Sequence, residues 1–292
     1  MDATAADGGS PLLIDGDVDE ERGSIDADRD LRIAGSVRSN ITVKTTGSVE
    51  IGGEVGAGAQ IDARGDVSVS GGIAGEGARV VAAGNVRAGH IRDGEAMAHG
   101  DIAVGDYVGH ARVRAGGRLV VEGTGDAIMG GETYATIALE VGGTVGSSSG
   151  ESTVVGIMAD PESAARLAKV HQGLRFCETD ILRILRTLGL KNVDKAQIQA
   201  VFQRTPTNKK KFFIDILKQL NQLVKVREEL FKKRDMHQDE SARRLREAQI
   251  RIAGKALAGV QIRMGELEFT LPQDLLGPSF YLADGRIGWR TD

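Results

Sequence analysis

A nine-residue pattern recurs along the first part of this chain and restricts its fold more than any other feature. Its nine positions are, in order, apolar, any, small, any, glycine, polar, apolar, any and apolar. Its six copies cover residues 25–33, 43–51, 61–69, 80–88, 96–104 and 113–121, and the first copy has Arg29 in place of the central glycine. Their centres are separated by 18, 18, 19, 16 and 17 residues. A period this regular indicates a repeat array.

Further glycines and apolar residues divide each repeat into three sides. A glycine about six residues after each centre precedes an apolar residue, as in Gly53 with Val55, and another apolar stretch follows, as at 59–61. We therefore predict a mainly β fold: a three-sided, right-handed parallel β-solenoid with about 18 residues per coil. Glycine, Asp and Asn suit its corners, and small branched side chains suit a narrow bore. A disordered glycine-rich tract is the alternative, but such tracts lack apolar residues at fixed spacing.

The strand period of two gives the register of each side. We expect Val67 and Ile102 to point into the bore, and Ser68 and Ala103 to point out of it.

Composition divides the chain into segments. Residues 1–160 hold 32 of the 40 glycines and a single lysine. Residues 161–256 hold 22 Lys and Arg against 11 Asp and Glu, a net +11, and the other 196 residues carry 15 against 30, a net −15. We predict a disordered tail over 1–11, the β-solenoid over 12–160, a basic coiled-coil hairpin over 161–256, and return strands over 257–292 that cap the solenoid.

Apolar spacing predicts the helical hairpin. From Pro161 the apolar residues alternate in steps of three and four, which is a heptad seam: Leu167, Val170, Leu174, Cys177, Ile181, Ile184 and Leu188. The segment 189–192 interrupts it, and the turn at 205–208 separates arms at 161–204 and 209–255. We expect an antiparallel hairpin about 65 Å long, because a helix rises 1.5 Å per residue.

This order of parts resembles the flagellar assembly protein A (FapA) family. The resembling segments are Ile14 to Val18, Ala63 to Val67, Ala82 to Val86, Gly123 to Gly131, Thr153 to Pro161 and Ala258 to Gly265. The resemblance implies a β-solenoid with an inserted coiled coil and a role in bacterial flagellar assembly or polar placement, without catalytic activity. Because the resemblance starts near residue 12, we expect no counterpart of the domain that usually precedes the solenoid in that family.

Residues that could carry chemistry are few. His90, His99 and His110 fall at different offsets in their repeats, so we expect them on different sides or corners. Segment 123–131 lacks the Lys-Ser/Thr of a phosphate loop, which favours a turn or bulge in a longer coil. Cys177 lies on the apolar seam and is expected to be buried. We therefore predict no enzyme activity and no catalytic, cofactor or metal site.

The remaining candidates are basic. We predict that one set on the hairpin binds an anionic partner, with solvated helix faces as the alternative: Lys209, Lys210, Lys211, Lys232, Lys233, Arg234, Arg243, Arg244 and Arg246. Nucleic acid is disfavoured, because no aromatic residues alternate with these cations to stack on bases. Protein partners are favoured, and peripheral membrane contact and a homo-oligomer stay open.

We expect a non-enzymatic scaffold of the FapA type in a bacterial cytoplasm. A single cysteine cannot form an internal disulfide, and residues 1–10 lack the regions of a signal peptide. The alternatives are a polymer-forming solenoid like the bactofilins and a hexapeptide-repeat acyltransferase. The acyltransferase requires a catalytic histidine at a coil boundary, and the long inserted hairpin argues against it.

Overall fold

The computed structural model describes residues 10–158 and 161–291, and the chain forms two compact units. One unit combines the residues up to 159 with those from 244 onward, and the other comprises residues 160–243. Most of the tail expected over 1–11 lies outside the described residues.

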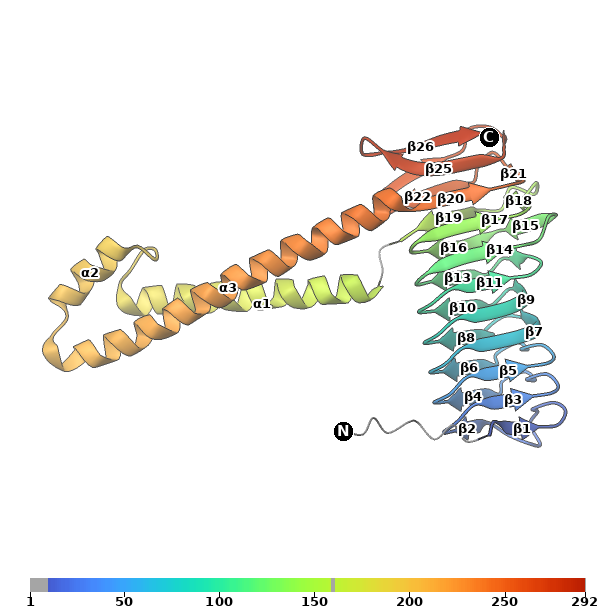
Figure 1. Cartoon of the computed structure of the whole chain (residues 1–292), viewed down its shortest axis with the longest axis horizontal. Helices are drawn as coiled ribbons and strands as arrows, with labels where there is room; N and C mark the ends of the chain where they lie inside the picture. Colours follow the sequence, from blue (N-terminus) through green and yellow to red (C-terminus); the bar gives the residue numbers. More distant parts are fainter. Residues whose placement is uncertain (1–9, 159–160, 292) are drawn as a thin grey trace, which may run out of the picture. The chain divides into compact units, whose positions relative to one another are not determined.

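The first unit is a parallel β-solenoid whose strands form three faces (Figure 1). Face 1 contains β1 (Leu12–Ile14), β3 (Leu31–Ile33), β5 (Val49–Ile51), the first part of β7 (Val67–Ala74), the first part of β9 (Val86–Arg92), β11 (Ile102–Val104), β14 (Arg118–Val121), β17 (Ala138–Val141) and β20 (Gln249–Ile252). Face 2 contains the second parts of β7 and β9, then β12 (Val108–Gly109), β15 (Asp126–Met129), β18 (Thr144–Val145) and β21 (Lys255–Ala256). Face 3 contains β2 (Ile25–Ala27), β4 (Thr42–Thr45), β6 (Gln60–Ala63), β8 (Arg79–Ala82), β10 (Glu95–Ala98), β13 (Arg112–Ala115), β16 (Gly131–Ala135), β19 (Thr153–Ile157) and β22 (Gln261–Met264).

The register between coils confirms the repeat and its period of about 18 residues. On face 1, Leu31 is aligned with Val49, and Val49 with Val67. On face 2, single bridges join Val37 to Val55 and Val55 to Ile73. The right-handed sense of the coil stays a prediction.

Alternate side chains fill the bore, as the strand period requires. Val67 is 1% exposed and Ile102 is 0% exposed, whereas Ser68 and Ala103 are half-buried on the outer surface. The inward and outward assignment made from the sequence is therefore confirmed. Segment 123–131 contains β15, whose pairing with β18 shifts register between Asp126 and Ile128, which confirms the predicted irregularity.

A ladder of side chains runs along the corner between face 3 and face 1. In successive coils a side-chain oxygen accepts a backbone N–H of the next coil: Asp30 Oδ1 from Ser48 at 2.7 Å, Ser48 Oγ from Asp66 at 3.1 Å, Asp66 Oδ1 from Asn85 at 2.7 Å, Asn85 Oδ1 from Asp101 at 2.8 Å, and Asp101 Oδ1 from Arg118 at 2.7 Å. A Cβ on Gly84 would collide with Asp66 Oδ1. The glycine of the repeat therefore makes room for the ladder.

The helices are inserted at this same corner, between β19 on face 3 and β20 on face 1. The solenoid then continues: β20 pairs in parallel with β17, β21 with β18, and β22 with β19. Two boundaries expected from the sequence are therefore corrected, because 249–256 is solenoid rather than hairpin, and β22 completes a coil rather than starting the cap. The end of the hairpin was misplaced because the helical and strand patterns meet between Glu247 and Gln249 without a Pro or Gly between them.

Antiparallel strands close the end of the solenoid that is reached last along the chain. These strands are β23 (Leu267–Thr270), β24 (Leu275–Leu276), β25 (Pro278–Ala283) and β26 (Arg286–Thr291). They pair with β22, β21, β20 and β25 respectively, and Phe280 is fully buried beneath them. The cap expected from the sequence is present, but it starts at Leu267.

The second unit consists of α1 (Pro161–Leu188), α2 (Lys195–Arg204) and α3 (Thr207–Glu247). The 44-residue first arm consists of two helices, which confirms the interruption expected at 189–192. Gly189 ends α1 in the left-handed conformation (φ 67°), with Leu190 N–H donating to Leu185 O and Gly189 N–H to Arg186 O. Asp194 begins α2 by accepting the N–H of Gln197.

Helix α1 packs against α3 in antiparallel fashion. The predicted seam residues Val170, Leu174, Cys177, Ile181 and Leu188 are buried, together with Leu185, and Ile184 is half-buried. On α3, Phe213 and Leu220 are buried in the same cluster as Ile181 and Leu188. Gly173 of α1 lies beside Leu230 of α3, which fixes the antiparallel direction.

Candidate interaction surfaces

The nine basic residues proposed from the sequence all lie on α3. Lys209 to Lys211 occupy its first turn, Lys232 to Arg234 its middle, and Arg243 to Arg246 its last part. The set extends over about 55 Å of helix at 1.5 Å per residue, so it is not one cluster.

Several of these cations already interact within the helices. The ammonium of Lys210 lies over the ring of Phe202 in α2, 5.4 Å from its centroid. Arg234 stacks on Phe231 at 4.9 Å and pairs with Asp235 at 2.7 Å. Arg243 and Arg244 also have partners. Lys209, Lys211, Lys232, Lys233 and Arg246 are exposed.

Two further lysines complete a regular row that was not predicted from the sequence. Lys211, Lys218, Lys225 and Lys232 are all exposed and follow one another at intervals of seven residues. Seven residues are close to two helical turns, so these four side chains share one face of α3 over about 31 Å. The contiguous basic runs stand out in the sequence, whereas the signal for this row is its heptad spacing. We call these four residues the lysine row.

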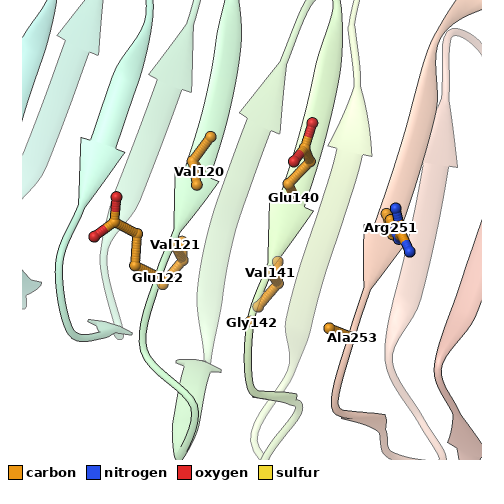
Figure 2. Close-up of a pocket in the computed structure, with 8 residues that line it drawn as sticks. All are labelled: Val120, Val121, Glu122, Glu140, Val141, Gly142, Arg251 and Ala253. Atoms are coloured by element: carbon orange, nitrogen blue, oxygen red, sulfur yellow. The ribbon is translucent and has the colours of Figure 1, made fainter.

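The outer surface of face 1 carries two shallow hollows. One, of about 270 Å³, is lined by Val120, Val121, Glu122, Glu140, Val141, Gly142, Arg251 and Ala253 (Figure 2). The other, of about 240 Å³, also includes Glu122 and is bordered by Arg87. Figure 2 shows Glu140 and Arg251 on neighbouring strands, where they are aligned in register. The mixed charges favour no single ligand.

The three histidines are not brought together. His90 on β9 stacks on Tyr107, with ring centroids 5.2 Å apart. His99 is exposed in the corner that follows β10, and His110 lies after β12, where its Nε2 is 3.3 Å from a carboxylate oxygen of Glu151. The prediction that they occupy different sides or corners is confirmed. Within residues 10–158 and 161–291, no group of three His, Cys, Asp or Glu could hold a metal ion.

A set of hydrogen-bonded polar side chains spans the coil that carries the insertion. The hydroxyl of Tyr134 on β16 accepts a hydrogen bond from Arg263 Nη1 on β22 at 3.0 Å, across β19. Gly156 of β19 permits this contact, because a Cβ there would lie 2.8 Å from the Tyr134 ring. Glu268 holds the other side of the guanidinium at 3.1 Å. The hydrogen bond and the electrostatic interaction with Tyr134 are the main causes that raise the pKa of Arg263, and Glu268 adds to them.

These features define a class: a parallel β-solenoid with helices inserted at one of its corners. A family model described as the Flagellar Assembly Protein A (FapA) beta solenoid domain matches residues 11–287. The chain belongs to this family, and its domain is one related to flagellar assembly. No curated protein and no solved structure matches the chain. Among the described helices, none is both long enough and apolar enough to cross a membrane.

Proposed function

We propose that this protein is a non-enzymatic scaffold of flagellar assembly or polar organisation in a bacterial cytoplasm, and that its helical unit binds partner proteins. One observation carries the proposal: a solenoid coil is interrupted at a corner by three helices, which end in a long helix bearing an exposed lysine row. A coil corner needs only a few residues, so about 90 extra residues at this corner serve something other than the solenoid's own fold.

Charge supports an anionic partner. The segment 161–256 carries a net +11, whereas the rest of the chain carries −15. Attraction between exposed charges is screened beyond about 8 Å at 0.15 M salt, so such a partner should dissociate as salt rises. We favour an acidic protein over nucleic acid, because residues 214–230, which hold Lys218 and Lys225, contain no aromatic side chain to stack on bases.

We favour the scaffold over a polymer of the bactofilin kind. End-to-end stacking requires open strand edges at both ends of the solenoid. Here β24, β25 and β26 close one end with antiparallel strands, and the exposed edge strand β26 carries Arg286 and Arg290. A hexapeptide-repeat acyltransferase is disfavoured, because His90 is stacked on Tyr107 and His99 and His110 lie on separate corners.

Charge reversal tests the proposal. We expect Lys211, Lys218, Lys225 and Lys232 changed together to Glu to lose the partners that the intact chain captures from cells. The control reverses four acidic residues of the solenoid's outer faces to Lys: Asp26, Glu50, Asp62 and Glu140. Unchanged capture by the first variant, with small-angle scattering that excludes unfolding, would contradict the role of the lysine row. A changed scattering profile without changed capture would mean that the row contacts the acidic solenoid of its own chain.

A further inference from the structure

A groove between α1 and α3 is separate from the lysine row. It has a volume of about 420 Å³ and is lined by Asp180, Arg183, Ile184, Thr187, Ile216, Gln219, Gln222, Leu223 and Val226. Ile184, Ile216 and Leu223 are half-buried at its floor, and Val226 is 46% exposed. The side of this helix pair is therefore apolar and incompletely covered.

Exposed phenylalanines extend the groove at both ends. Phe176 is 63% exposed and precedes Arg183 by seven residues on α1. Phe212 is 61% exposed and precedes Gln219 by seven residues on α3. Residues seven apart share a helix face, so both rings lie on the same sides of their helices as the groove residues. A pair of helices with such a strip presents the surface that an amphipathic third helix covers.

The charges beside the groove are mainly positive. Arg183 is at its edge, with its side chain 73% exposed, although it pairs with Asp180 at 2.8 Å. Continuing the seven-residue spacing places the exposed Lys169 beyond Phe176 on α1 and the exposed Lys233 beyond Val226 on α3. Because the helices are antiparallel, these two lysines lie toward the same end of the groove. The flanks of a helix in this groove would therefore meet cations.

We propose that this groove binds one amphipathic helix of a partner protein, with apolar residues at helical spacing and acidic residues on its flanks. The inference rests on the proposed role of the helical unit in partner binding and gives that role a specific site. A second copy of this chain fits less well, because it would bring two sets of Arg183, Lys169 and Lys233 together. A membrane surface fits less well, because Ile184, Ile216 and Leu223 lie at the floor of a concave groove.

Site-specific cross-linking in cells tests the groove and captures its occupant in the same experiment. A photo-reactive phenylalanine analogue replaces Val226 in the full chain. The control places it at Leu182, which is 53% exposed on α1, does not line the groove and is not part of the lysine row. Both positions are exposed enough to accept the analogue, and circular dichroism verifies the helices.

We expect an adduct at position 226, absent at 182, whose cross-linked segment belongs to another protein and has a net negative charge with apolar residues at three- and four-residue spacing. An adduct with a second copy, with the solenoid of the same chain or with lipid would overturn the proposal, as would equal labelling at both positions or no adduct at all.

A synthetic peptide of the cross-linked segment then provides a binding measurement. Val226→Glu should weaken its affinity about tenfold or more, because it places a charge against the apolar face of the bound helix, and Leu182→Glu should not. Equal affinities for both variants would contradict the groove as the site. If the chain without its helices still captured every partner, the broader proposal would fail; if it captured none but position 226 gave no adduct, only the groove would fail.

Discussion

Asp66 Oδ1 accepts the backbone N–H of Asn85 at 2.7 Å, so a side chain in one coil holds the main chain of the next. Asn85 Oδ1 repeats the arrangement with Asp101 at 2.8 Å. In five of the six repeats the polar residue that follows the central position is therefore a link between coils, in addition to a residue that suits a turn.

We predict that Asp66→Ala lowers the free energy of unfolding by about 1 kcal/mol, the usual net contribution of one such hydrogen bond. Asp62→Ala is the matched control, because Asp62 is exposed on the outer surface of β6. Chemical denaturation of both variants measures the difference. Equal stabilities would mean that the ladder does not hold the coils together.

A charge in the bore should be far more harmful than the same charge outside it. Val67→Asp places an unpaired carboxylate at a site that is 1% exposed, and we expect it to cost about 3 kcal/mol or more. Ser68→Asp, on the outer surface of the same strand, should cost well under that amount. If the Val67 variant melted no earlier than the Ser68 variant, the register of face 1 would be wrong.

The corrected boundary of the insertion gives a third prediction. Replacing 161–247 by a short flexible linker removes the three helices and keeps β20, so the solenoid should stay folded and circular dichroism should lose nearly all its helical signal. Extending the replacement to 256 also removes β20 and β21, which pair with β17 and β18. That second variant should be clearly less stable, and equal melting temperatures would contradict the continuation of the solenoid.

Acid should weaken the first coils through Asp17. The backbone N–H of Ser36, 2.7 Å from Oδ1, is the main cause that lowers the pKa of Asp17, and the side chain of Arg38 adds to it. The stability contributed by this carboxylate is therefore present above the pKa of an unfolded aspartate, about 3.9, and is lost as pH falls through the lowered folded value.

An NMR titration of the Asp17 carboxyl measures this shift directly. In Arg38→Gln the Asp17 pKa should rise, yet stay below the unfolded value, because the Ser36 N–H remains. A wild-type pKa at or above 3.9 would contradict the contribution of these two hydrogen bonds.

The solenoid was predictable because its constraint is local and repeated. Bore residues such as Ile61 and corner residues such as Gly65 recur at nearly the same spacing in successive coils. Each further copy of the pattern therefore supports the alignment of the copies before it. The coil that follows the sixth copy of the pattern was missed. It has Thr133 and Leu139 at repeat positions but Ile137 in place of the central glycine. The coil after that is divided by the insertion, so Ile157 and Ile250 are far apart in sequence.

The surfaces were less predictable, because they depend on which helix faces remain uncovered. The seam through Leu174 and Ile181 follows from spacing alone. The groove beside Ile184 and Leu223 depends on which residues of α1 lie beside which residues of α3, and the sequence predicts the antiparallel direction but not this register. The contiguous basic runs led to the prediction of Arg234, which is stacked on an aromatic ring and paired with a carboxylate. They did not predict Lys218 and Lys225, which complete the lysine row.

We expect the helical unit, rather than the solenoid, to bind the partners. The most direct measurement of this binding is quantitative affinity capture from cells with the intact chain and with the variant in which a linker replaces 161–247, scored together with swimming motility. We predict that the variant stays folded, loses the captured partners and fails to restore motility to cells that lack the protein. Retention of the same partners and full motility by the folded variant would contradict the account.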